Sequence, residues 1–225
     1  MDFSIIIDSL PLYGEGLWMT LKLVSVSLAF GLVFGMLLAV LQNSKWAILR
    51  LPVFGFSFVF RGTPLLVQLF LFYNGMAQIG FVRDGPLWAV FQDAYYVALI
   101  VFSLNTSAYT CEIFRGALAN IHRGQIAAAI ACGMSPLKIL YRIEIPLAFR
   151  QGLSSYGNEV IFMLHGSSLA STITLMDLTG AARMVNSRYY SPAEAFLVAG
   201  LIYLGLTFVL IKAFRMMERR LLVTT

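Results

Sequence analysis

Long apolar stretches alternate with short polar connections along almost the whole chain. A membrane-spanning helix requires about 20 mostly apolar residues, at a rise of about 1.5 Å per residue. Five stretches meet this requirement, and they predict helices over residues 17–41, 52–81, 95–118, 151–175 and 193–214. The pattern therefore predicts an all-α membrane protein of about five transmembrane helices, in which residues 1–225 form a single domain.

The composition agrees with this pattern. Hydrophobic residues make up 59% of the 225 residues and charged residues 12%, and the mean hydropathy is +0.80. These values lie well beyond the apolar share of a soluble domain. The N-terminus is acidic where a cleavable secretory signal is basic, so we expect the first span to remain in the mature protein. Cys111 and Cys132 lack the spacing of a metal or redox pair, and no metal site is expected.

The distribution of basic residues predicts the orientation in the membrane, because cytoplasmic connections carry an excess of lysine and arginine. On one side the connections hold Lys45, Arg50, Arg115, Arg123, Lys138, Arg142, Arg150, Lys212, Arg215, Arg219 and Arg220. The opposite connections hold Arg83, Arg183 and Arg188 among several acids. We therefore expect the N-terminus outside and the C-terminus inside. The net charge of +5 is explained by this asymmetry, and no nucleic-acid partner is needed to account for it.

Polar side chains interrupt the predicted spans. Such side chains are costly in a bilayer, so they usually face protein or water and are candidates for a substrate pathway. Thr63-Pro64 also interrupts the second span, because proline removes a backbone hydrogen bond. The pathway candidates are Arg61, Gln68, Asn105, Tyr109, Glu112, Asn158, Glu159, His165, Ser167 and Ser168.

Two of these candidates, Arg61 and Glu159, have two interpretations each. In the first, Glu159 binds the cationic side chain of a substrate, and Arg61 binds the substrate carboxylate together with Ser167 and Ser168. In the second, Arg61 forms a structural ion pair with Glu159 or with Glu112. Both interpretations are compatible with the sequence.

The remaining candidates are grouped by helical spacing. Asn105, Tyr109 and Glu112 lie close to one face of the third span, where they either line a cavity or join helices by hydrogen bonds. On the fourth span, Glu159 is expected to share a face with Phe162, and His165 to continue it. For His165, packing between helices is the simpler alternative to a role as ligand or proton relay.

The cytoplasmic connection at residues 124–146 has a different character. Strong helix formers fill residues 125–131, and Gly133 suits the left-handed position that ends a helix. Ser135 and Pro136 then provide an N-cap and a first-turn proline for a second helix. This second helix is expected to end near Ile145-Pro146, where proline disfavours helix in the preceding residue and bends the chain before the fourth span. The connection is therefore predicted to be a rigid helix–turn–helix that projects into the cytoplasm.

This connection resembles the cytoplasmic signature of bacterial ABC importer permeases, in which Glu-Ala-Ala, three residues, Gly, nine residues and Ile-x-Leu-Pro follow one another. Ala127 stands in place of the glutamate and Ile145 in place of the leucine, and the first change leaves the polarity of the contact surface open. The residues that match the signature are Ala128, Ala129, Gly133, Ile143 and Pro146.

Three further segments are similar to the polar amino acid permeases: FRGTPLLVQ (60–68), LNTSAYTCEIFRGAL (104–118) and NEVIFMLHGSSLASTITLMDLTG (158–180). The likeness extends over most of the chain and is strongest for the M-type subunits that serve histidine, lysine, arginine and ornithine or the opines. It implies a multi-pass protein of the bacterial inner membrane that transports a polar amino acid of the basic group, or an opine.

The resemblance also implies partners. These are two cytoplasmic ATPase subunits that bind ATP and magnesium, a second permease subunit that is identical or homologous, and an external substrate-binding protein. The chain has no G-x-x-x-x-G-K-[ST] phosphate loop, so we expect it to hold no cofactor and to be no enzyme by itself. Coupling to the ATPase is implied for Ala128, Ala129, Gly133, Ser135, Pro136, Ile143 and Pro146.

Two other classes compete with this interpretation. A self-sufficient secondary transporter is one, but five spans without an inverted repeat disfavour it. A membrane-embedded enzyme is the other, but His122 and His165 lie on different segments and no nucleophile or metal-ligand spacing accompanies them.

Overall fold

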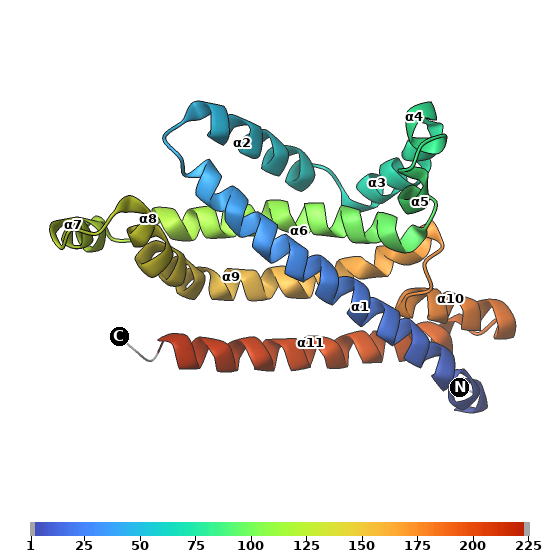
Figure 1. The fold of residues 1–225 in the computed structure, drawn as a ribbon. Helices are drawn as coiled ribbons and strands as arrows, with labels where there is room; N and C mark the ends of the chain where they lie inside the picture. The colour runs from blue at the N-terminus through green and yellow to red at the C-terminus, as the bar shows by residue number, and fades with distance from the viewer. Residues whose placement is uncertain (1–2, 223–225) are drawn as a thin grey trace.

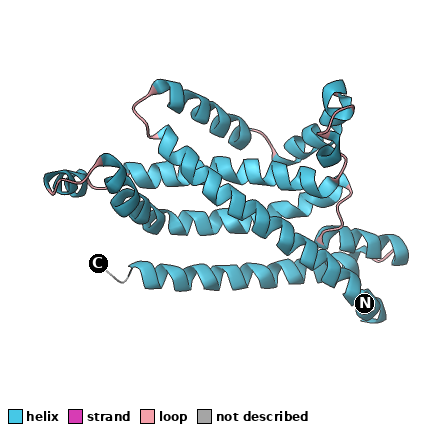
Figure 2. Cartoon of the chain, viewed as in Figure 1, coloured by secondary structure: helices cyan, strands magenta, loops and turns pink. Residues whose placement is uncertain are grey.

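A computed structural model describes residues 3–222, and the elements within this range are helical, with no strand among the described residues. In Figure 1 the long N-terminal helix crosses the other long helices obliquely, and each long helix contacts at least one other. Short loops join the elements (Figure 2). The prediction of an all-α fold is confirmed. The long helices are α1 (Phe3–Gln42), α6 (Ala94–Ala119), α9 (Ile145–Gly166) and α11 (Pro192–Leu222).

Shorter helices fill the connections. Between α1 and α6 lie α2 (Ala47–Gly62), α3 (Leu65–Phe70), the π-helix η1 (Leu71–Gly75), the 3₁₀-helix η2 (Met76–Gln78), α4 (Gly80–Arg83) and α5 (Trp88–Phe91). Between α6 and α9 lie α7 (Arg123–Ala131), α8 (Pro136–Ile139) and the π-helix η3 (Leu140–Glu144). The 3₁₀-helix η4 (Ser167–Ile173) and α10 (Leu178–Tyr189) precede α11.

Three helices are long and apolar enough to cross a membrane by themselves, within α1, α6 and α11. Two further spans result if each bent pair of helices counts as one. Helix α2 and the helical segment Leu65–Gln78 form a bend of 103° at Thr63-Pro64, and residues 136–173 form a bend of 48° with α10. By length and composition the described residues thus provide three to five spans.

Helix α6 is the centre of the bundle, because it contacts α1, α2 and α9. Its large apolar side chains Phe102 and Phe114 are fully buried. Glycine at Gly35 allows α1 to approach it closely, since a Cβ there would lie 2.6 Å from the Cβ of Thr110. Small residues at such contacts let membrane helices pack backbone to backbone. The tight α1–α6 pair forms a fixed wall against which α2 and α9 are placed.

The expected end of the helix at Ile145-Pro146 is wrong. The helix continues from α8 through η3 into α9, and Pro146 lies in the first turn of α9. The reason is the π-turn of η3, in which the N–H of Ile145 donates to the carbonyl of Leu140. This wider turn shifts the hydrogen-bond register just before the proline, so the missing N–H of Pro146 does not end the helix.

Candidate functional site

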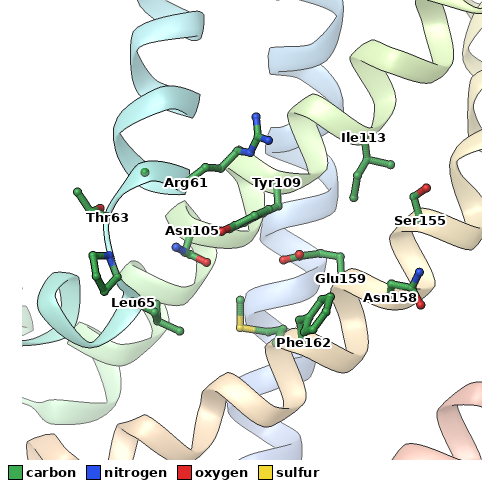
Figure 3. A pocket seen from close by; sticks show the side chains of 13 residues that line it. Arg61, Thr63, Leu65, Asn105, Tyr109, Ile113, Ser155, Asn158, Glu159 and Phe162 are labelled. Carbon is green, nitrogen blue, oxygen red and sulfur yellow. The ribbon is translucent and has the colours of Figure 1, made fainter.

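A cavity of about 690 Å³ lies between the end of α2, the middle of α6 and the middle of α9. Figure 3 shows the side chains of the three elements converging on it. Five of the predicted pathway residues line it: Arg61, Asn105, Tyr109, Asn158 and Glu159. The structure therefore brings together residues that are up to about a hundred positions apart in the sequence.

The α2–α3 break provides one wall of the cavity. Thr63 ends α2 in an extended conformation, and Pro64 follows it. Because Pro64 has no N–H, the carbonyl of Phe60 four residues earlier loses its helical partner. Two buried amides replace that partner: the Nε2 of Gln68 donates to the Phe60 oxygen at 2.8 Å, and the Nδ2 of Asn105 donates to it at 3.2 Å. The break is thus stabilised by side chains from α3 and α6.

The same two amides are also bonded to each other and to the break itself. Asn105 donates to the Oε1 of Gln68 at 3.2 Å. Gln68 donates further to the carbonyl of Thr63 at 3.0 Å and to its hydroxyl at 2.8 Å. Most of the hydrogen-bonding capacity of Gln68 is therefore used within the protein, and Gln68 lies behind the cavity wall.

Glu159 on α9 is the buried acid of the cavity. Only 6% of the residue is exposed, and its carboxylate points from α9 toward α6 (Figure 3). Among the residues that the structure describes, it forms no ion pair, and the buried hydroxyl of Thr106 lies beside it. A buried carboxylate is costly unless it is protonated or paired, so Glu159 is the acid of this cavity whose charge the described residues do not neutralise.

Arg61 lies at the opposite wall, but its guanidinium turns away from Glu159 (Figure 3). It approaches Glu112 instead, with Nη1 and Oε2 3.5 Å apart, and it lies over the ring of Tyr109 at 5.6 Å. Of the two ion pairs that the sequence left open, the structure selects the one with Glu112. The side chain of Arg61 remains 40% exposed, so its donors are still accessible from the cavity.

Arg61 is not the nearest partner of Glu112, because two other side chains form shorter contacts with its carboxylate. Both Nε and Nη2 of Arg115 donate to its Oε2, at 3.0 and 2.9 Å. The amide of Gln42 at the end of α1 donates to its Oε1 at 2.7 Å. Glu112 therefore keeps its charge compensated by Arg115 even if Arg61 moves.

Three more predicted pathway residues, His165, Ser167 and Ser168, lie outside the cavity lining near the end of α9. Ser167 and Ser168 begin the 3₁₀-helix η4, where their hydroxyls donate back to the carbonyls of Leu164 and His165. The imidazole of His165 lies 3.0 Å from the hydroxyl of Thr207 on α11. The expectation that His165 continues the face of Glu159 is therefore wrong, since six α-helical residues amount to about one and two-thirds turns.

The connection at residues 124–146 projects from the end of the bundle, with α7 farthest out (Figure 1). Gly133 ends α7 with φ of +74°, as predicted. Ser135 stands at the N-cap of α8 without a side-chain hydrogen bond, and Pro136 begins the helix. Two large apolar side chains, Ile130 and Leu137, are 61% and 70% exposed there. Such exposed apolar residues at a protruding turn are typical of a contact surface.

Comparison with known proteins now identifies the family. Residues 31–223 match the family described as binding-protein-dependent transport system inner membrane component. The chain belongs to this family. It is 42% identical to the nopaline transport system permease protein of Agrobacterium fabrum, over 97% of this chain and 91% of that one. It is also 42% identical to the histidine/lysine/arginine/ornithine transport system permease protein of Salmonella typhimurium, over 91% of this chain and 88% of that one.

Solved structures agree with this membership. The permease fold is similar to a chain in the crystal structure of an amino acid ABC transporter with histidines, with a TM-score of 0.86 and 32% identity over 98% of this chain and 99% of that one. The MetNI methionine ABC transporter resembles it in fold alone, with a TM-score of 0.78 at 19% identity over 93% of this chain and 96% of that one. The resemblance to importer permeases is thereby confirmed.

The cavity of this permease also contains residues that sequence reasoning did not select. Ser155, Ile113 and Met163 line it. Phe162, which was expected to share a face with Glu159, lines it too and is 71% exposed. Ile113 and Met163 are ordinary apolar positions in a transmembrane helix, so no sequence signal distinguishes them. Ser155 is four residues before Glu159, so the i, i+4 spacing on α9 was the available signal.

Proposed function

We propose that this permease translocates a cationic amino acid, or an opine that carries a cationic side chain, through the cavity between α2, α6 and α9. The observation that carries the proposal is the carboxylate of Glu159, which is buried at the cavity and has no ion-pair partner among residues 3–222. The two relatives support the same substrate class, because one is named for nopaline and the other for histidine, lysine, arginine and ornithine.

The proposed binding mode uses both walls. Glu159 takes the cationic side chain, and Arg61 leaves Glu112 to take the substrate carboxylate as a charge-assisted pair. The amide of Asn158 and the hydroxyl of Tyr109 supply additional polar contacts, and Phe162 packs on the aliphatic part of the substrate. All five residues line the same cavity. Opposite charges at two ends suit a substrate that itself carries opposite charges.

We further propose the complex in which the permease works. Two cytoplasmic ATPase subunits bind ATP and magnesium, and the α7–α8 connection fits into them as a rigid lever. A second permease subunit packs against this one, and an external protein delivers the substrate. The N-terminus then lies outside the inner membrane and the C-terminus inside. A self-sufficient secondary transporter is the weaker alternative, since the relatives belong to binding-protein-dependent systems.

Uptake by the assembled complex in vesicles tests the substrate site. Glu159→Gln keeps the shape of the side chain but removes its charge, and a charge-assisted hydrogen bond contributes about 1.5–3 kcal/mol. We expect transport of arginine to fall about ten- to a hundredfold, while assembly stays normal. Asp84→Asn, which removes an acid outside the cavity, is the matched control and should transport at the normal rate. Normal arginine transport by the Glu159→Gln complex would refute the site.

A further inference from the structure

A second polar pocket lies where α1 ends, α2 begins and α6 approaches its last turns. Its volume is about 420 Å³, and it shares no lining residue with the cavity described above. Its polar wall includes Asn43, Ser44, Arg50 and Arg115, and its apolar wall includes Leu51 and Phe54. The transport mechanism proposed above uses none of these six residues to contact substrate.

The polar wall offers hydrogen-bond donors that the protein does not use. Arg50 is exposed and has no ion-pair partner within residues 3–222. Arg115 gives Nε and Nη2 to Glu112, which leaves its Nη1 available. The hydroxyl oxygen of Ser44 accepts from the N–H of Trp46 at 3.2 Å, so its own hydrogen is free to donate. Guanidinium and hydroxyl donors together are the usual ligands of a phosphate group.

Glu112, which also lines the pocket, does not cancel the preference for a phosphate group. Glu112 already accepts from Arg115 and from Gln42, and Arg61 approaches it from the other side. The charge of Glu112 is thus compensated before Arg50 is counted. The pocket therefore presents a net positive charge to a ligand that enters beside Arg50.

The apolar wall continues away from the pocket along α2. Leu51, Phe54 and Phe58 follow one another at spacings of three and four residues, which places them on one face of the helix. They are 61%, 54% and 68% exposed, and the rings of Phe54 and Phe58 stack with centroids 6.1 Å apart. A ligand bound at Arg50 would therefore lie beside an apolar track formed by Leu51, Phe54 and Phe58. An apolar chain on the ligand could pack on this track, whereas a small soluble anion would make no use of it.

The neighbourhood of the pocket matches the edge of a bilayer. Trp46, four residues before Arg50, is 72% exposed, and tryptophan is enriched at the membrane–water interface. The orientation proposed above puts this end of the bundle at the cytoplasmic leaflet, where anionic lipids concentrate and basic pockets between helices bind their headgroups.

We propose that this pocket binds an anionic phospholipid of the inner leaflet, with its phosphate at Arg50 and Arg115 and an acyl chain along Leu51, Phe54 and Phe58. The lipid proposal rests on the proposed orientation of the permease but not on the proposed substrate of the cavity. A failure of lipid binding at this pocket is therefore distinguishable from a failure of the substrate site.

Native mass spectrometry of the assembled complex tests this site. The purified complex is titrated with phosphatidylglycerol or with phosphatidylcholine of the same acyl chains, and bound lipids are counted. We expect phosphatidylglycerol to bind more tightly. Arg50→Gln should weaken it about five- to tenfold, as expected for one arginine at the membrane surface. Lys45→Gln removes a neighbouring cation that does not line the pocket, and its effect should stay below twofold.

Further variants separate the two halves of the site. Arg50→Lys keeps the charge and should retain most of the lipid binding even if Arg50→Gln assembles poorly. Phe54→Ala should weaken both lipids, because it shortens the apolar track. Equal affinity for the two lipids, or equal effects of Arg50→Gln and Lys45→Gln, would overturn the proposal. So would displacement of phosphatidylglycerol by inorganic phosphate at equal concentration, which would indicate a soluble-anion site.

Discussion

The buried amide of Gln68 offers a quantitative test of how the α2–α3 break is held. Its Nε2 donates to the carbonyls of Phe60 and Thr63 and to the Thr63 hydroxyl, and its Oε1 accepts from Asn105. Gln68→Leu keeps the size of the side chain but removes all four interactions. The carbonyl of Phe60 keeps only the 3.2 Å bond from Asn105, and the remaining groups lose a partner in a buried place.

The expected magnitude follows from the number of groups left unpaired. A buried polar group that loses its partner costs about 1–3 kcal/mol. Thr63 lies at the exposed end of the break and regains water, so we count mainly Asn105 and the weakened contact to Phe60. Gln68→Leu should therefore lower the free energy of unfolding by about 2–4 kcal/mol. For a chain of this size, this corresponds to a fall of about 5–15 °C in the midpoint temperature.

Size-exclusion chromatography of the fluorescently tagged complex, after heating to a series of temperatures, measures this midpoint. Gln92→Leu, at an exposed glutamine of the α5–α6 connection, is the matched control and should shift the midpoint by less than 2 °C. Asn105→Leu combined with Gln68→Leu should cost less than the sum of the single changes, because the two amides share one carbonyl. A Gln68→Leu complex as stable as the control would show that the break is held by packing alone.

Two further predictions concern the ends of the molecule. Gly133→Val forces a β-branched residue into a left-handed conformation at a cost of roughly 1–2 kcal/mol, so the loaded binding protein should stimulate the ATPase less. The control Gly124→Ala within α7 should leave this stimulation unchanged. Equal stimulation in both variants would refute the coupling role. In a cysteine-free background, Gly85→Cys and Ser187→Cys should react with an impermeant thiol reagent added outside, and Arg123→Cys should not. Labelling of Arg123→Cys from outside would refute the proposed orientation.

Local features of the fold were predictable from the sequence because their signals act over a few residues. Helix α6 was expected over residues 95–118 and spans Ala94–Ala119, where Asp93 caps its first turn by accepting from the N–H of Tyr95 at 2.8 Å. The left-handed Gly133 and the break at Thr63-Pro64 are similar cases, since glycine and proline restrict their own backbone whatever surrounds them.

Features that depend on neighbouring helices were not predictable. The π-turn before Pro146 keeps a helix continuous where the proline alone favours an end. The partner of Arg61 depends on the rotation of α2 about its axis, which the sequence does not specify, and both Glu112 and Glu159 were open to it. The direction of His165 depends on where α11 packs, since its contact there is Thr207.

The polar residues of the spans differ in whether the protein itself provides their hydrogen-bond or ion-pair partners. Gln68 and Asn105 bond to a carbonyl that Pro64 leaves free, and Glu112 is bonded by Arg115 and Gln42. Burial makes these groups costly unless they are paired, and the protein pairs them internally. Glu159 is more buried than Glu112, yet no cation within the described residues pairs with it. Polarity within a span therefore identifies candidates, and the missing ion-pair partner is what distinguishes Glu159 from the other acid and makes it the basis of the proposed substrate site.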